Sequence, residues 1–240
     1  MSRVIASRVL SRFFAICALA WCSACHSAPP SYYPLTEGMT WEYQVTVRQR
    51  SPEGATQPPK VDIAVVTNLA PQTLMGVRVT PQRTDMAGLL RTMFLIEDAT
   101  GVRIFALQAM DAAKPEVQDE TSYVLRYPVG AGSAWADSAT TMLMKETVSL
   151  PQTSRIESVN ETVTVLAGTF ANCVRVTSSG STAKRFKDLV GVAQIQVEAD
   201  AWYAPDVGLI KAMQRESSNR PVLGSGDMTF ELKAFKPRRS

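Results

Sequence analysis

The chain has 240 residues, with 25 basic and 22 acidic side chains, one histidine and four cysteines. It is long enough to bury a core in a single domain, and it has no cluster of Lys and Arg of the kind that nucleic-acid surfaces need. The single histidine, His26, excludes a Ser-His-Asp triad and a histidine-ligated zinc site from the rest of the chain. We therefore predict no nucleic-acid partner, no metal site and no cofactor.

The first 24 residues are typical of a secretory signal peptide. Arginines at positions 3, 8 and 12 precede the apolar run Phe13–Trp21, and small residues follow that run. The uncharged stretch from Phe13 to Cys25 has 13 residues, fewer than the roughly 20 that a membrane-spanning helix needs. We expect residues 1–24 to be removed on export.

Ser23-Ala24-Cys25 resembles the end of a bacterial lipobox, whose cysteine is lipidated, for example with palmitate, and becomes the first mature residue. Leu19-Ala20-Trp21-Cys22 is a competing frame, although bulky Trp21 stands where a small side chain is needed. Cleavage without lipid is a third reading. We favour lipidation at Cys25, with His26 in the tether and not in a metal site. Because no Asp follows Cys25, the resemblance implies an anchor in the outer membrane, facing the periplasm.

The remaining chain is predicted to contain a lipidated cysteine and tether (25–36), a single β-rich domain (37–236) and a tail (237–240). Two cysteines, Cys17 and Cys22, leave with the signal peptide, and Cys25 takes the lipid. Cys173 is then the one thiol of the domain, which excludes an internal disulfide although the export compartment would permit one.

Apolar and polar residues alternate along much of the domain, and this period of two predicts strands with one buried face. The predicted buried rows are Trp41–Val47, Val61–Leu69, Val159–Val165, Ile195–Tyr203 and Met228–Ala234. Short turns, such as Ala167-Gly168 and Pro205-Asp206, separate neighbouring runs, as in antiparallel hairpins, and we expect roughly ten strands. Loops rich in Pro, Gly, Ser or acidic residues are expected at 51–59, 111–121 and 217–226.

A long antiparallel sheet with one wet face must bury its other face by curling or by pairing with a second sheet. We predict an all-β fold, a single strongly curved antiparallel sheet in the form of a half-open clam or a barrel, with little helix. Helical turns are considered only at 109–114 and 137–145, and neither stretch combines a cap with an apolar stripe.

Three stretches of the domain carry a family resemblance. They are Tyr32-Tyr33-Pro34-Leu35 with Gly38, Trp41 and Tyr43; Ala167-Gly168-Thr169-Phe170 with Cys173 and Val176; and Trp202–Lys211. Together they resemble bacterial envelope lipoproteins that carry a TapB-like domain of unknown function. The resemblance implies a β-rich, membrane-tethered protein and brings no catalytic residues with it.

The predicted apolar face mixes large and small side chains, which leaves two interpretations open. The small residues either accommodate aromatic side chains in a filled core or leave a groove for an acyl chain. Trp202 and Tyr203 point to opposite faces of their strand, so at most one of them is core. The residues predicted to form this groove or core are Trp41, Tyr43, Ala199, Ala201, Trp202 and Tyr203.

Two classes of function remain. The first is a non-catalytic lipoprotein that is held at the membrane through Cys25 and binds an envelope protein or an apolar ligand. The alternative is an envelope enzyme that uses carboxylates, such as Glu198 and Asp200 on one strand face, or the thiol of Cys173 beside Arg175. The sequence has no nucleophile motif and no histidine beyond His26. We therefore favour the first class and predict no catalytic residue.

Overall fold

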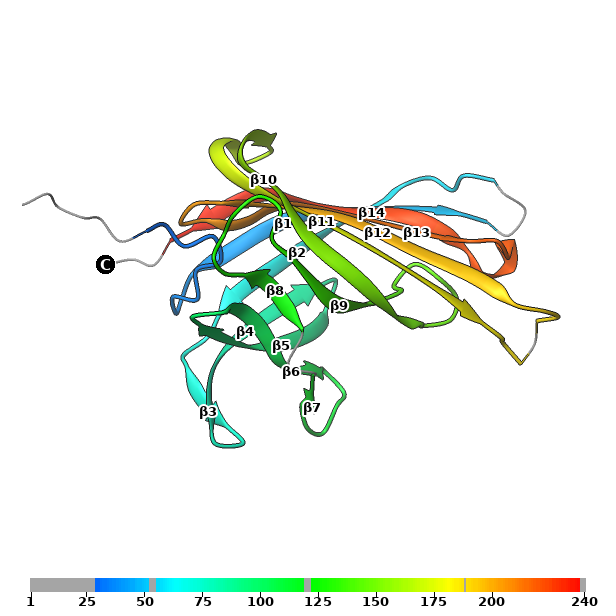
Figure 1. Cartoon of the computed structure of the whole chain (residues 1–240), viewed down its shortest axis with the longest axis horizontal. Coiled ribbons are helices and arrows are strands. Elements are labelled where there is room, and N and C mark those ends of the chain that lie inside the picture. The colour runs from blue at the N-terminus through cyan, green and yellow to red at the C-terminus, as the bar shows by residue number, and fades with distance from the viewer. Residues whose placement is uncertain (1–28, 52–54, 119–121, 188, 238–240) are drawn as a thin grey trace, which may run out of the picture.

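The computed structural model describes residues 29–51, 55–118, 122–187 and 189–237, and in these residues the chain is built almost entirely of strands (Figure 1). The strands are β1 (Thr40–Arg50), β2 (Lys60–Asn68), β3 (Gln72–Leu74), β4 (Val77–Met86), β5 (Leu89–Asp98), β6 (Gly101–Ala109), β7 (Glu116–Val117), β8 (Tyr123–Arg126), β9 (Ala134–Thr140), β10 (Ser149–Val165), β11 (Gly168–Lys184), β12 (Ala193–Ala204), β13 (Gly208–Ser218) and β14 (Ser225–Lys236). One 3₁₀ turn, η1 (Pro221–Leu223), precedes β14. The predicted all-β fold with little helix is confirmed.

All the strands join one antiparallel sheet in the order β7-β6-β5-β4-β2-β1-β14-β13-β12-β11-β10-β9, with β3 beside β4 and β8 beside β6. In the described part of the chain, β9 pairs only with β10, so the sheet curls without closing. Figure 1 shows the short strands β4–β8 beneath the long strands β11–β14, which extend beyond them to one side. The sheet therefore has the half-open form of the prediction and not the barrel form.

The curl brings strands from the two ends of the sheet into one core. Leu95 of β5 and Val102 of β6 share a buried cluster with Ile156 of β10 and Val174 of β11, although these strands are far apart in the sheet order. Apolar burial of this kind contributes roughly 25 cal/mol for each Å² removed from water. Strands β5 and β6 are thus joined to β10 and β11 by side-chain packing, without direct strand pairing between them.

The segment that leads into β1 belongs to the folded domain. Ser31 and Asp206 pair reciprocally: the Ser31 N–H donates to Asp206 Oδ1 (3.0 Å), and the Asp206 N–H donates to Ser31 O (2.7 Å). Tyr33 is buried, and its ring lies 6.1 Å from that of Tyr203. A Cβ at Gly208 would lie 3.2 Å from Pro34 Cδ, so a glycine with φ of 91° permits this close approach. Part of the predicted tether, residues 31–36, therefore packs against the sheet.

The face of β2 that the sequence predicted to be buried is the wrong one. Val61 and Val65 are 56% and 37% exposed, and Ile63 between them is exposed too. The register explains this inversion: Tyr43 pairs with Ala64 and Val45 with Asp62. Cross-strand partners share a face of a sheet, so the buried β1 side chains bring the even-numbered residues of β2 to the concave side.

Two further segments differ from their predictions. Residues 137–145, considered for a helical turn, form the end of β9 and the loop that follows it. Residues 109–114 form the end of β6 and a turn.

Strand β4 has no counterpart among the predicted strands, because polar residues and Pro81 interrupt its apolar pattern. The β10–β11 hairpin is longer than predicted, and its register shifts three times between Ile156 and Val163. Its tip reaches β14, where the Ala167 N–H donates to Leu232 O.

Candidate functional site

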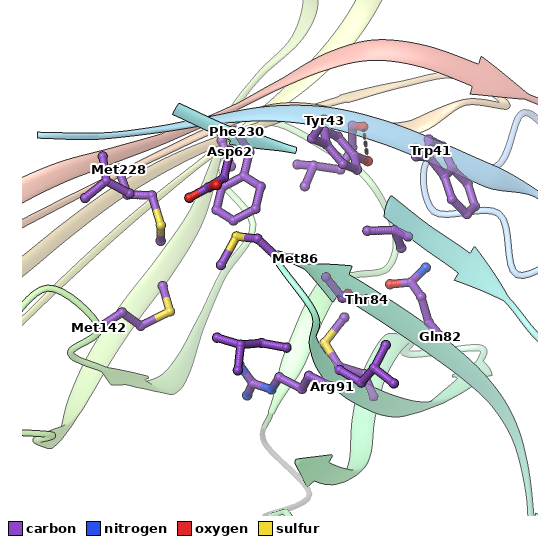
Figure 2. A pocket seen from close by; sticks show the side chains of 18 of the residues that line it. Trp41, Tyr43, Asp62, Gln82, Thr84, Met86, Arg91, Met142, Met228 and Phe230 are labelled. Carbon is purple, nitrogen blue, oxygen red and sulfur yellow. Dashed lines mark hydrogen bonds between the residues drawn. The ribbon is translucent and has the colours of Figure 1, made fainter. Parts of the chain in front are cut away.

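The concave side of the sheet holds a cavity of about 630 Å³ (Figure 2). In Figure 2, Trp41 and Tyr43 hang from β1 above it, while Gln82, Thr84 and Arg91 of β4 and β5 lie below it. The full lining is Tyr33, Pro34, Trp41, Tyr43, Val47, Gln49, Lys60, Asp62, Val66, Gln82, Thr84, Met86, Leu89, Leu90, Arg91, Met93, Met142, Leu143, Gly208, Leu209, Ala212, Met228 and Phe230.

The upper wall consists of aromatic side chains held by hydrogen bonds. Trp41 Nε1 donates to Val207 O (2.6 Å), and Tyr43 Oη donates to Leu209 O (2.7 Å). Tyr43 also meets Phe230 of β14 edge to face, with 6.3 Å between ring centres. Burial raises the pKa of Tyr43 well above its usual value, so the phenol stays protonated and keeps donating. The polar atoms of this wall are thus bonded to backbone carbonyls, and its apolar surface faces the cavity.

The lower wall is the β4–β5 hairpin. Ala87 and Gly88 connect the two strands with φ of 52° and 80°, as in the turns that suit the twist of a two-residue hairpin. Met86 lies just before this turn, and Figure 2 shows its side chain between the two walls. Since β4 ends at Met86, opposite Ala64, the first residues of β2 extend beyond the end of the hairpin. The hairpin therefore leaves the cavity uncovered on this side.

The inner end of the cavity contains a buried chain of polar groups. Tyr33 Oη donates to Gln82 Oε1 (2.7 Å), and Gln82 Nε2 donates to Asn68 Oδ1 (2.9 Å). Asn68 Nδ2 in turn donates to the carbonyl oxygens of Pro34 and Thr36, at 3.0 and 3.2 Å. Burial raises the pKa of Tyr33, so its hydroxyl keeps the proton that it donates to Gln82. Tyr33, Gln82 and Asn68 thus each have a hydrogen-bond partner, as buried polar groups require.

The mouth of the cavity lies at the opposite end and is exposed. Leu89 is 66% and Met142 52% exposed, whereas Trp41 and Tyr43 are buried. The charged lining residues, Lys60, Asp62 and Arg91, are all exposed, so they border the opening of the cavity. The mouth therefore combines apolar and charged side chains that face water.

A loop between β9 and β10 covers one side of the mouth, and a buried carboxylate holds it. Glu216 of β13 is 1% exposed, and its two oxygens accept the N–H groups of Met142 (2.7 Å) and Leu143 (2.9 Å). Gln214 Nε2 also donates to Glu216, at 2.8 Å. Gln49 Nε2 donates to Leu143 O on the other side of the loop. Met142 and Leu143 thereby contribute to the lining.

The structure separates the residues that the sequence grouped as groove or core. Trp41 and Tyr43 line the cavity, whereas Ala199, Ala201, Trp202 and Tyr203 do not. Tyr203 packs in the core against Tyr33. Trp202 lies on the other face of β12, where Nε1 donates to Glu161 Oε2 (2.7 Å) and the Arg175 guanidinium lies 5.3 Å from its ring centre. The small residues that do line the cavity are Gly208 and Ala212 of β13.

The lining residues that sequence reasoning missed come mainly from β2, β4 and β5. Lys60 and Asp62 lie on the polar side of an alternating pattern, which predicts a face of β2 in contact with solvent. The β4–β5 hairpin had one usable signal, the Ala87-Gly88 pair between two extended stretches. Met142 and Leu143 had none, because a buried glutamate on another strand fixes their loop.

The groups considered for catalysis are occupied by other contacts. Cys173 is fully buried, its thiol donates to Phe170 O (3.4 Å), and burial raises its pKa. Asp200 accepts Nε and Nη2 of Arg175 at 3.0 and 2.7 Å. Glu198 accepts Gln196 Nε2 on the exposed surface. None of these residues lines the cavity.

The described ranges contain no group of three His, Cys, Asp or Glu side chains placed to hold a metal ion. Within the same ranges, no helix is long and apolar enough to cross a membrane. The predicted signal peptide and Cys25 lie outside the described residues, so lipidation at Cys25 stays a prediction.

Comparisons with known proteins found two similar solved structures. A predicted lipoprotein from Parabacteroides distasonis aligns over 88% of this chain and all of its own, with 15% identity and a TM-score of 0.39. A predicted exported protein with a YmcC-like fold from Bacteroides fragilis aligns over 87% of this chain and all of its own, with 12% identity and a TM-score of 0.37. Likeness at this level carries no functional argument.

Neither sequence comparison found a match: no protein-family model fits the chain, and no curated protein matches it. The resemblance to proteins with a TapB-like domain is therefore not supported by a family match.

Proposed function

We propose that this chain is a membrane-tethered envelope lipoprotein that binds an apolar ligand in the cavity of its concave face and catalyses no reaction. The observation that carries this proposal is the cavity of about 630 Å³ between the aromatic wall of β1 and the β4–β5 hairpin. Its volume lies within the roughly 300–1,000 Å³ that is usual for small-molecule sites.

The chemistry of the lining supports an apolar ligand. Four methionines, Met86, Met93, Met142 and Met228, lie among aromatic and aliphatic side chains. Methionine is unbranched and polarizable, so it adapts to ligands of irregular shape. Leu89 and Met142 expose apolar surface at the mouth that a bound chain would cover.

The candidate reactive groups support a non-catalytic role. A buried thiol with a raised pKa, such as that of Cys173, is a poor nucleophile. Asp200 is engaged by Arg175, and Glu198 lies in solvent away from the cavity. The alternative of a carboxylate- or thiol-dependent enzyme therefore has no assembled site among the described residues.

The ligand is tested by native mass spectrometry of protein purified from periplasm without detergent. We use the Cys25→Ser chain, which lacks the predicted acylation site. It should carry a bound mass of lipid size, and Ala212→Phe, which fills the cavity, should abolish that mass. Ala199→Phe is the matched control, because it adds the same ring outside the lining and should keep the ligand. Each change costs about 1–3 kcal/mol of stability through overpacking. A bare protein, or a ligand that survives Ala212→Phe, would contradict the proposal.

The anchor is tested by fractionation of cells that express the wild type, Cys25→Ala or Cys22→Ala. The wild type and Cys22→Ala should sediment with the outer membrane, while Cys25→Ala should leave the membrane fraction and lack the mass of the acyl groups. If Cys25→Ala stays in the membrane fraction with unchanged mass, lipidation at Cys25 is refuted. If only Cys22→Ala releases the protein, the lipidated residue is Cys22 and not Cys25.

A second candidate function is the binding of an envelope protein. The exposed row Val61, Ile63 and Val65 on the convex face of β2 favours it, because three apolar side chains in line form a small surface of the kind that partners cover. If the cavity is empty in protein from periplasm, this row is the next surface to test.

A further inference from the structure

We infer that the ligand carries a negatively charged head group, which binds at Lys60 and Arg91 while a single acyl chain fills the cavity. This inference rests on the proposed function. It commits to one occupant, an anionic single-chain amphiphile such as a fatty acid, and the distribution of charge along the cavity supports it.

The cavity is divided sharply between an uncharged interior and a charged mouth. Its charged lining residues are Lys60 and Asp62 of β2 and Arg91 of β5. At the inner end the polar groups are the neutral side chains of Tyr33 and Gln82, which bond to each other. A ligand with a charge at one end and an apolar body matches this division.

The two cations lie on different walls of the mouth and are available to a ligand. Lys60 comes from the upper wall and Arg91 from the lower one, and Figure 2 shows Arg91 on the side of the cavity opposite to β1 and Asp62. Among the described residues, neither cation is within 4 Å of an acidic oxygen. Arginine and lysine donors suit carboxylate and phosphate groups.

The length of the cavity suits one chain. Its upper wall follows β1 from Trp41 to Gln49, about 27 Å at ~3.4 Å per strand residue. The hydrocarbon core of a bilayer is about 30 Å thick, so an acyl chain in one leaflet spans about half of that. The cavity therefore accommodates an extended chain with its head group at Lys60.

Asp62 reduces the positive charge of the mouth and provides a control of opposite sign. Two cations and one carboxylate leave a net charge of +1 at this end of the cavity. Removal of Asp62 should strengthen the binding of an anionic head group, whereas removal of either cation should weaken it. A steric effect of these substitutions would not change sign in this way.

The test is isothermal titration of the Cys25→Ser protein, freed of co-purified ligand, with oleate and with uncharged monoolein, which share one acyl chain. Wild type should bind oleate severalfold more tightly. Lys60→Gln and Arg91→Gln should each weaken oleate binding about two- to fivefold, as expected for exposed ion pairs, and weaken monoolein binding less. Asp62→Asn should tighten oleate binding about twofold. Salt should reduce the preference for oleate, since it screens exposed charges.

Arg83→Gln is the matched control, because Arg83 is exposed on β4 and does not line the cavity. It should change the binding of neither amphiphile. Equal binding of oleate and monoolein, with no response to Arg91→Gln, overturns the head-group inference and leaves the proposed function intact. Failure of both amphiphiles to bind refutes the proposed function itself.

Discussion

Polar side chains are buried and hydrogen-bonded at the inner end of the cavity, whereas those at the mouth are exposed. At the inner end, Tyr33, Gln82 and Asn68 are buried and bonded to one another. At the mouth, Lys60 and Arg91 are exposed and form no ion pair within the described residues. A buried polar group without a partner destabilises the fold, whereas an exposed charge is solvated. Stability therefore depends on the inner end, and the mouth is free to recognise a ligand.

This difference gives each end its own experimental signature. Substitutions at the inner end should lower the free energy of unfolding and leave the preference between charged and uncharged ligands unchanged. Substitutions of the charged residues at the mouth should change the preference between charged and uncharged ligands and leave the free energy of unfolding unchanged. The comparison is wrong if substitutions at the inner end change ligand preference, or if substitutions of the charged residues at the mouth lower the free energy of unfolding.

The largest effect is expected at Tyr33. Tyr33→Ala should lower the free energy of unfolding by about 3–5 kcal/mol, because it removes a buried aromatic ring from the core and leaves a void. Tyr33→Phe keeps the ring and should cost about 1–3 kcal/mol, since Gln82 Oε1 then lacks its donor. Urea denaturation measures both. If Tyr33→Phe leaves stability unchanged and alters ligand preference, the inner end is part of the binding site and the comparison is wrong.

A smaller effect is expected at Glu216, which holds the loop at the mouth. Glu216→Ala leaves the N–H groups of Met142 and Leu143 without their acceptor and should cost about 2–3 kcal/mol. The loop that carries these residues should loosen, so bound ligand should dissociate faster. Glu216→Gln retains one acceptor oxygen, so its free energy of unfolding should lie between those of the wild type and Glu216→Ala. Unchanged stability and an unchanged rate of ligand release in Glu216→Ala would show that the loop is held by its other contacts.

The fold was predictable because its strands are long and their hairpins short. The alternation of Trp41, Tyr43 and Val45 with polar residues gives the strand and its buried face correctly. The same rule fails on β2, where Val61 faces water and Asp62 faces the cavity. A period of two identifies the two faces of a strand, but it cannot say which is concave when both the convex surface and the cavity mouth are wet.

The site was less predictable, because its walls come from strands that meet only through the curl of the sheet. Trp41 and Tyr43 were identified as large residues on an apolar row, and they line the cavity. Ala199 and Ala201 were chosen for their small size, but the cavity passes Ala212 of the neighbouring strand instead. Sequence patterns show which residues share a strand face, whereas the strands that surround a cavity depend on tertiary packing.

The reciprocal pairing of Ser31 with Asp206 sets a limit on how the domain is held at a membrane. Ser31 is the sixth residue after Cys25, so an anchor at Cys25 would keep Ser31 within about 20 Å of the bilayer surface. Tyr33, two residues later, lies at the inner end of the cavity. The cavity mouth lies about 27 Å farther along β1. If Cys25 carries the predicted lipid, the inner end of the cavity would therefore lie close to the membrane, and the domain could not move far from its anchor.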